Sequence, residues 1–167
     1  MALIVEDGSV VAGANTYLDV ADANTILAIF GYALPAVTAD AEAALTTAAQ
    51  YLESFRRQFQ GSKVSSTQAL QFPRSGVYID CILFASDAIP VELKYAQALA
   101  AYETSQGKKL QANSNGQTII EKSVAGAVTV KYADNGQDSA QIQFSQIDSY
   151  IDVLIQQNGS GFQVFRA

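Results

Sequence analysis

Apolar side chains recur at helical spacing in several stretches of the chain, most clearly between residues 41 and 59. They follow one another at intervals of three and four residues, which places them on one face of a helix: Ala41, Ala44, Leu45, Ala48, Leu52, Phe55 and Phe59. Thr38 and Asp40 are capable N-caps for this helix, and Gly61 ends it. We interpret the stripe as a core face, on which the alanines allow another helix to approach closely.

The same kind of pattern predicts three further helices. Asp19 is a suitable N-cap for a first helix that ends at Gly31. Pro90 suits the first position of a third helix, which runs to about Thr104 and is apolar around most of its girth, as is typical of a central, buried helix. A fourth helix is expected over about residues 145–156, with one apolar face: Ile147, Ile151, Leu154 and Ile155.

A β-hairpin is predicted at about residues 119–132, and its register follows from the cross-strand pairs. A three-residue loop over 125–127 brings opposite charges and hydroxyl groups face to face, and each such pair contributes roughly 0.2–1 kcal/mol. A two-residue turn would instead place Lys122 and Lys131 on the same face as Ile120, so the longer loop is favoured. The predicted pairs are Val124 with Val128, Ser123 with Thr129, Lys122 with Val130, Glu121 with Lys131 and Ile120 with Tyr132.

The remaining stretches lack a clean period. Residues 3–5 predict a short strand, ended by a turn at Glu6-Asp7-Gly8, that pairs with another element such as the hairpin. Residues 61–89 read as a long loop, a length that in a compact domain is usually functional, disordered or misread. Residues 159–161, Gly-Ser-Gly, form a flexible joint before the apolar hexapeptide 162–167. That hexapeptide either packs back on its own domain or adds as a strand to a partner's sheet edge.

The fold class is therefore mainly α: a small bundle of about four helices with a β-hairpin and extended terminal segments. We expect a single domain over residues 1–158 and a flexible tail over 159–167. With 167 residues the chain is within the range of one domain and needs no metal or disulfide to stabilise it. Only 16% of the residues are charged, against about 25% in typical domains. This leaves apolar and small polar surface for contacts with other subunits.

The charge balance argues against a basic nucleic-acid groove. Lys and Arg number 10 against 16 Asp and Glu, a net charge of −6, and no more than two cations are adjacent, as in Arg56-Arg57. Tight binding to phosphates needs clustered cations, although a negative protein can surround DNA without adhering to it. No run is long and apolar enough to span a membrane, and the N-terminus has no basic start typical of a signal peptide. We expect a soluble protein.

The chain also lacks the usual residues of catalytic sites. It contains no histidine, its single cysteine is Cys81, and it has no Gly-rich phosphate-binding motif. Asp148 and Asp152 lie four residues apart on a predicted helix and could offer two carboxylates to a metal, but a solvated helix surface explains them better. We therefore expect no enzyme activity, no catalytic residue, no metal and no cofactor.

Several motifs, taken in order, resemble a known phage family. The chain opens with Ile4-Val5-Glu6-Asp7-Gly8 and Val11-Ala12-Gly13-Ala14-Asn15-Thr16-Tyr17, continues through Ala21-Asp22-Ala23 and Ala48-Ala49-Gln50-Tyr51-Leu52-Glu53, and then reads Gln68-Ala69-Leu70-Gln71-Phe72-Pro73-Arg74-Ser75-Gly76. Phe72 stands where the family more usually has Trp. Matches to the third helix and the hairpin follow: Ile89-Pro90, Lys94, Ala96, Glu121, Val124, Gly126, Val128 and Tyr132. Together these segments resemble the head–tail connector proteins of long-tailed phages, also catalogued as DnaT-like single-stranded-DNA-binding proteins.

The resemblance implies a structural adaptor in the phage neck. About twelve copies would form a ring beneath the portal protein, followed by a stopper or tail-completion protein, and DNA would pass through the lumen without specific binding. Such a protein is assembled in the host cytoplasm and ends in the virion. The alternative is a primosome-like protein that binds single-stranded DNA, which would need a basic groove with aromatic stacking platforms.

Two groups of residues are candidates for contacts in such an assembly. Tyr95 and Tyr102 of the third helix and Phe72 and Arg74 of the long loop are expected at a subunit interface. For the loop pair the alternative is that Phe72 and Pro73 pin the loop onto the second helix. In the tail, four residues are candidates for docking on the portal: Phe162, Val164, Phe165 and Arg166.

Overall fold

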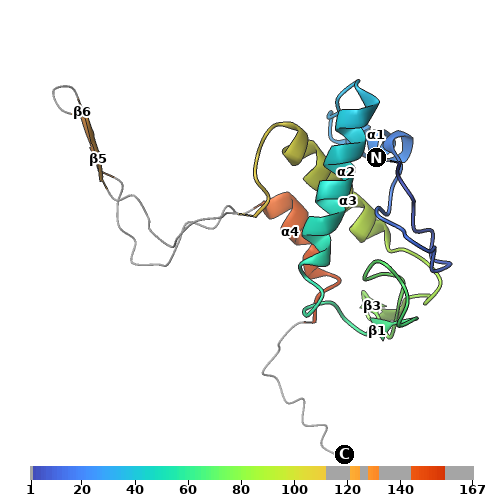
Figure 1. Cartoon of the computed structure of the whole chain (residues 1–167). Coiled ribbons are helices and arrows are strands. Elements are labelled where there is room, and N and C mark those ends of the chain that lie inside the picture. Colours follow the sequence, from blue (N-terminus) through green and yellow to red (C-terminus); the bar gives the residue numbers. More distant parts are fainter. Residues whose placement is uncertain (1, 112–120, 125–127, 132–143, 157–167) are drawn as a thin grey trace, which may run out of the picture. The chain divides into compact units, whose positions relative to one another are not determined.

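The computed structural model describes residues 2–111, 121–124, 128–131 and 144–156 of the chain (Figure 1). It is mainly α, as predicted. Its helices are α1 (Val20–Ile29), α2 (Thr38–Glu53), α3 (Val91–Ser105) and α4 (Ser145–Asp152). No helix in the described part of the chain is long and apolar enough to cross a membrane.

The helix α3 is the centre of the helical core, since it packs against α1, α2 and α4. Its buried residues include four alanines, whose short side chains allow close helix packing: Leu93, Ala96, Gln97, Ala98, Leu99, Ala100 and Ala101. The predicted stripe of α2 faces it, with Ala41, Leu45, Ala48 and Leu52 fully buried. The prediction of a central third helix is confirmed.

The helix ends were predicted less well than the helices. Asp19 caps α1 as expected, because its carboxylate accepts a hydrogen bond from the Asp22 amide at 2.7 Å. For α2 the predicted caps are wrong: Val37 is the N-cap and makes no side-chain capping bond. Pro90 lies at the N-cap of α3, one position before the predicted one.

Two helices also end earlier than their apolar patterns predict. The helix α2 ends at Glu53 and continues as turns through residues 54–58, and α4 ends at Asp152. The apolar residues beyond these ends meet each other instead, since Phe59 and Ile155 form an antiparallel bridge. Phe59 and Leu154 are thus buried outside the helices, Phe59 in the bridge and Leu154 in the turn that follows α4.

The long stretch 61–89 contains two short antiparallel strand pairs that its sequence does not reveal. Strand β1 (Ser62–Lys63) pairs with β2 (Arg74–Ser75), and β3 (Tyr78–Ile79) pairs with β4 (Ile82–Leu83). Strands of two residues are too short to show an alternating pattern. The β3–β4 turn also hides its signal, because Asp80 and Cys81 adopt φ values of 51° and 65°, where Asn or Gly is usual.

The N-terminal segment pairs with the residues that precede α1. Val5 forms a parallel bridge with Thr16, and the Glu6 amide donates to the Thr16 carbonyl at 2.9 Å. The turn expected at Glu6-Asp7-Gly8 is organised by the fully buried Glu6. Its carboxylate accepts hydrogen bonds from the amides of Gly8, Val10 and Val11 at 2.9–3.0 Å.

The predicted hairpin is present as β5 (Glu121–Val124) and β6 (Val128–Lys131). Its register is the predicted one, from Val124 opposite Val128 to Glu121 opposite Lys131. The pair Ile120 with Tyr132 lies outside the described residues, as does the tail 159–167. The hairpin belongs to a unit separate from the one that contains the helices.

Candidate interaction sites

The loop residues Phe72 and Arg74 lie inside the chain's own fold. Phe72 is fully buried and its ring contacts that of Phe59 edge-on, with 5.2 Å between ring centroids. Arg74 is 7% exposed and donates from Nε to the Gln60 carbonyl at 2.6 Å and from its terminal nitrogen to the Gly61 carbonyl at 2.7 Å. Burial lowers the pKa of Arg74. This placement favours the alternative in which the loop is pinned to its own core, and it leaves little of either side chain for a neighbouring subunit.

A buried phenol that sequence reasoning missed fixes this loop on α2. The Tyr17 hydroxyl donates to the Glu53 carboxylate at 2.6 Å and accepts from the amides of Gln71 and Phe72 at 3.1 and 3.2 Å. Burial raises the pKa of Tyr17 well above its usual value, and the negative charge of Glu53 adds to the effect. All of these partners belong to the fold, so the phenol acts as a clamp between the loop and α2.

A buried amide makes a second clamp at the centre of the core. Gln97 of α3 is fully buried. Its Nε2 donates to Thr16 Oγ1 at 2.7 Å and to the Leu45 carbonyl at 3.0 Å, and its Oε1 accepts from the Tyr17 amide at 3.0 Å. It therefore ties the N-terminal segment to α2 and α3, and its polar groups are satisfied as burial requires.

The two tyrosines predicted at a subunit interface are half-buried in aromatic contacts within the chain. Tyr102 stacks on Tyr32 with 4.2 Å between ring centroids. Tyr95 lies edge-on to Phe30 at 6.2 Å and to Tyr150 of α4 at 5.3 Å. A contact of Tyr95 or Tyr102 with a second subunit stays a prediction, and only part of each ring is open for it.

The hairpin β3–β4 exposes large apolar side chains that the sequence analysis did not single out. Tyr78 and Leu83 lie directly opposite each other on the two strands and are 53% and 60% exposed. Ile82, the next residue of β4, pairs with Ile79 on the other side of the hairpin and is 72% exposed. We call these three residues the hairpin patch. Large exposed apolar side chains grouped on one short hairpin make it a candidate surface for a protein contact.

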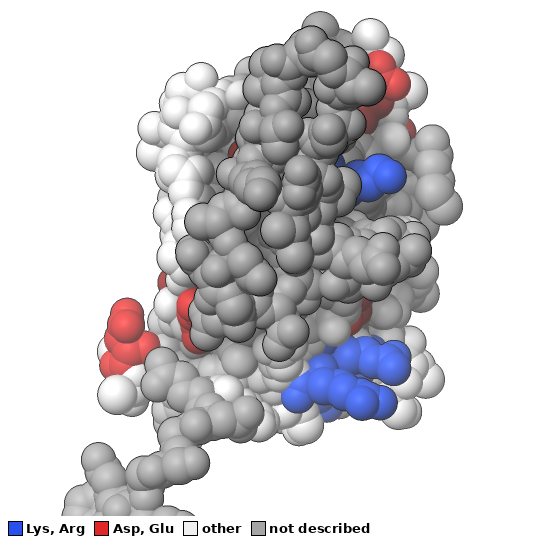
Figure 2. Space-filling model, turned by 90° about the vertical axis from the view of Figure 1, so that its left-hand side faces the viewer, with Lys and Arg blue, Asp and Glu red and all other residues white. Residues whose placement is uncertain are grey.

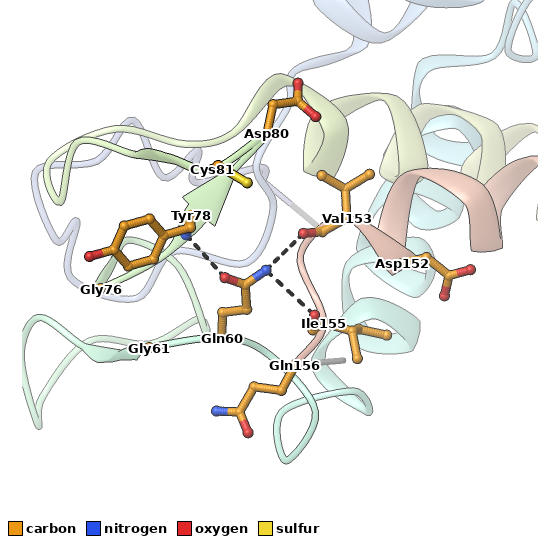
Figure 3. A pocket seen from close by; sticks show the side chains of 10 residues that line it. All are labelled: Gln60, Gly61, Gly76, Tyr78, Asp80, Cys81, Asp152, Val153, Ile155 and Gln156. Atoms are coloured by element: carbon orange, nitrogen blue, oxygen red, sulfur yellow. Dashed lines mark hydrogen bonds between the residues drawn. The ribbon is translucent and has the colours of Figure 1, made fainter. Parts of the chain in front are cut away.

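An open groove of about 760 Å³ lies between the hairpin and the chain after α4 (Figure 3). Gln60 stands at its floor, where its Nε2 donates to the Val153 carbonyl at 2.9 Å and its Oε1 accepts from the Tyr78 amide at 3.0 Å. Among the described residues that line the groove, Asp80 and Asp152 carry carboxylates and none is a lysine or arginine. It is suited to hold a chain segment that brings apolar side chains and positive charge.

The Lys and Arg side chains lie in small groups apart from one another on the face that Figure 2 shows. Arg56 and Arg57 are exposed where α2 has ended. Burial and the neighbouring Asp152 raise the pKa of Asp148, but no group of three or more potential metal ligands occurs among the described residues.

The four tail candidates Phe162, Val164, Phe165 and Arg166 lie outside the described residues, so their docking role stays a prediction. A protein-family comparison bears on the whole chain. The model of the family described as "Putative DnaT-like ssDNA binding protein" matches residues 1–167. No curated protein and no solved structure matches the chain. The family match supports the single-stranded-DNA alternative of the sequence analysis better than the adaptor, about which it says nothing.

Proposed function

We propose, for a chain that belongs to the family of DnaT-like ssDNA binding proteins, a structural role as a head–tail adaptor in the neck of a tailed phage. Copies of the chain would form a ring, about twelve by resemblance, that docks on the portal, receives a stopper or tail-completion protein and lets the genome pass. The ordered motifs from Ile4 to Tyr132 support this role. The net charge of −6 is compatible with a lumen that DNA crosses without adhering.

The observation that carries the proposal is the hairpin patch. Three large apolar side chains on one short hairpin are open to solvent, and burying apolar surface contributes roughly 25 cal/mol per Å². A protein that works alone gains nothing from this exposure, whereas a ring subunit buries it against a neighbour. The hairpin that carries the patch is held in place at both ends of its strands. The Tyr78 amide of β3 donates to Gln60 Oε1, and beyond β4 the Phe84 amide donates to the Val77 carbonyl at 2.8 Å.

A test of the adaptor role combines the purified protein with its portal and counts subunits by native mass spectrometry or electron microscopy. We expect rings on the portal for the unmodified chain and at least about a tenfold loss of ring assembly for Leu83→Ser, because about 1.4 kcal/mol at each subunit contact already changes its equilibrium tenfold. Ile29→Ser is the matched control, because Ile29 is 69% exposed on α1 and away from the hairpin. Absence of rings with the unmodified protein would refute the adaptor.

The second candidate is binding of single-stranded DNA, which rests on the family description itself. Such binding needs cations along the phosphates and aromatic rings for the bases. Arg56 and Arg57 are exposed, and Tyr78 is the exposed aromatic side chain among the described residues.

Titration of a labelled oligonucleotide at low and moderate salt separates the two functions. The DNA-binding function predicts tight binding that weakens steeply with salt and is reduced by the double variant Arg56→Ala, Arg57→Ala. The adaptor predicts no binding that depends on these two residues. Lys108→Ala with Lys109→Ala is a control that removes the same charge at the other adjacent pair of cations.

A further inference from the structure

After the turn that ends α4, residues 154–156 pair along one edge with residues 58–60. The Gln60 amide donates to the Leu154 carbonyl at 2.9 Å, and the Gln156 amide donates to the Gln58 carbonyl at 2.7 Å. In this antiparallel bridge the bonds are made by the residues that flank Ile155 and Phe59. The N–H and C=O of Ile155 therefore point away from residues 58–60, toward the groove beneath the β3–β4 hairpin. There the Ile155 carbonyl accepts a hydrogen bond of 3.4 Å from Gln60 Nε2, and its second lone pair can accept another (Figure 3).

The sequence that follows is suited to pair with this second edge. Asn158-Gly159 is the strongest two-residue turn signal for a β-hairpin. A two-residue turn there places Gln157 opposite Ser160, Gln156 opposite Gly161 and Ile155 opposite Phe162. The closing pair of such a turn is hydrogen-bonded and the pairs then alternate, so Ile155 and Phe162 form a hydrogen-bonded pair. The N–H and C=O of Ile155, which point away from residues 58–60, would therefore face Phe162 and bond with it.

We propose that residues 160–167 of the same chain fold back as a strand along residues 155–157 and occupy the groove. Phe162 then lies beside Ile155, between it and Tyr78, and the strand is the third member of a small sheet with residues 58–60. At about 3.3 Å per residue, residues 160–164 span roughly 16 Å, and the groove of about 760 Å³ has room for several side chains.

Charge favours the same occupant. The groove is lined by Asp80 and Asp152, whereas the tail 157–167 carries Arg166 as its one charged side chain. Folding back also costs little association entropy, because a tail attached to Gln156, itself a lining residue, has an effective concentration in the millimolar range. The segment is thus an internal ligand of the groove, and this assignment does not depend on the proposed function.

Disulfide trapping tests the proposal directly, because Cys81 is the chain's single cysteine and lines the groove. Gln163→Cys and Val164→Cys are made separately in the full chain, since neighbouring positions of a strand face opposite sides. We expect one of them to form an intrachain disulfide with Cys81 at least about tenfold faster than the control Gln106→Cys on the exposed end of α3, as the local concentration predicts. Non-reducing electrophoresis distinguishes intrachain from interchain products.

A turn variant provides the second measurement. Gly159→Val disfavours the positive φ that the turn needs and should slow trapping about tenfold, and it should remove protection of the Ile155 amide in hydrogen exchange. Trapping no faster than in the control, or disulfide-linked dimers whose yield rises with protein concentration, would overturn the proposal. Dimers would assign the groove to the tail of a second copy.

Discussion

The Tyr17 hydroxyl and the Glu53 carboxylate meet at 2.6 Å inside the fold, although the residues lie far apart in the sequence. The pair joins the N-terminal segment to the end of α2, and the amides of Gln71 and Phe72 complete it. Together with the Arg74 bonds to Gln60 and Gly61, this phenol therefore fixes the loop that leads to the groove and to the hairpin patch.

Tyr17→Phe should destabilise the fold by about 1–3 kcal/mol, because it leaves the buried Phe72 amide without its acceptor and removes one hydrogen bond each from Gln71 and Glu53, which stay bonded to each other. The expected measurement is a lower urea midpoint with an unchanged slope, together with faster hydrogen exchange in residues 68–75. Tyr78→Phe is the control, since the Tyr78 side chain is 53% exposed. Equal stability of the two variants would contradict the role given to Tyr17.

The same group predicts a loss of stability in alkali. The pKa of Tyr17 is raised in the folded chain, so above the usual tyrosine value near 10 the unfolded chain releases its proton first. The contribution of Tyr17 to the free energy of unfolding is therefore fully present below pH 10. It falls as the pH rises further, by up to about 1.4 kcal/mol per pH unit. Urea unfolding between pH 9 and 11 should show a smaller decline for Tyr17→Phe than for the unmodified chain. A decline of the same size in both would contradict the assignment.

The elements that the sequence predicts well are those whose signals are local. The stripe of α2, the all-round apolar α3 and the β5–β6 register each follow from residues close together in the chain. The clamps made by Tyr17 and Gln97 could not be predicted, because each joins segments tens of residues apart through a single polar side chain. The hairpin patch was missed for a different reason: strands of two residues show no period, and their turn uses Asp80 and Cys81 in place of glycine.

Glu6 should be as sensitive as Tyr17, since its carboxylate accepts three backbone hydrogen bonds while fully buried. In Glu6→Gln one side-chain oxygen becomes a donor that faces backbone N–H groups, and we expect a loss of about 1–3 kcal/mol. Asp7→Asn is the matched control on the neighbouring exposed carboxylate, which accepts hydrogen bonds from Ser9. Thermal unfolding of the two variants in parallel measures the difference. A Glu6→Gln melting temperature equal to that of Asp7→Asn would show that the buried carboxylate does not organise the turn.

Gly8 gives a prediction in which steric contact and backbone strain can be separated. It has φ of 111°, and a Cβ placed on it would lie 2.1 Å from the Asp87 carbonyl oxygen. Gly107 has φ of 79° and no atom within 4 Å of such a Cβ. Gly107→Ala therefore measures strain alone, about 1–2 kcal/mol, whereas Gly8→Ala must also displace the loop that precedes α3 and should cost more. Chemical denaturation of both variants gives the comparison. Equal losses would mean that residues 87–88 yield freely, and that the N-terminal turn does not fix the start of the central helix.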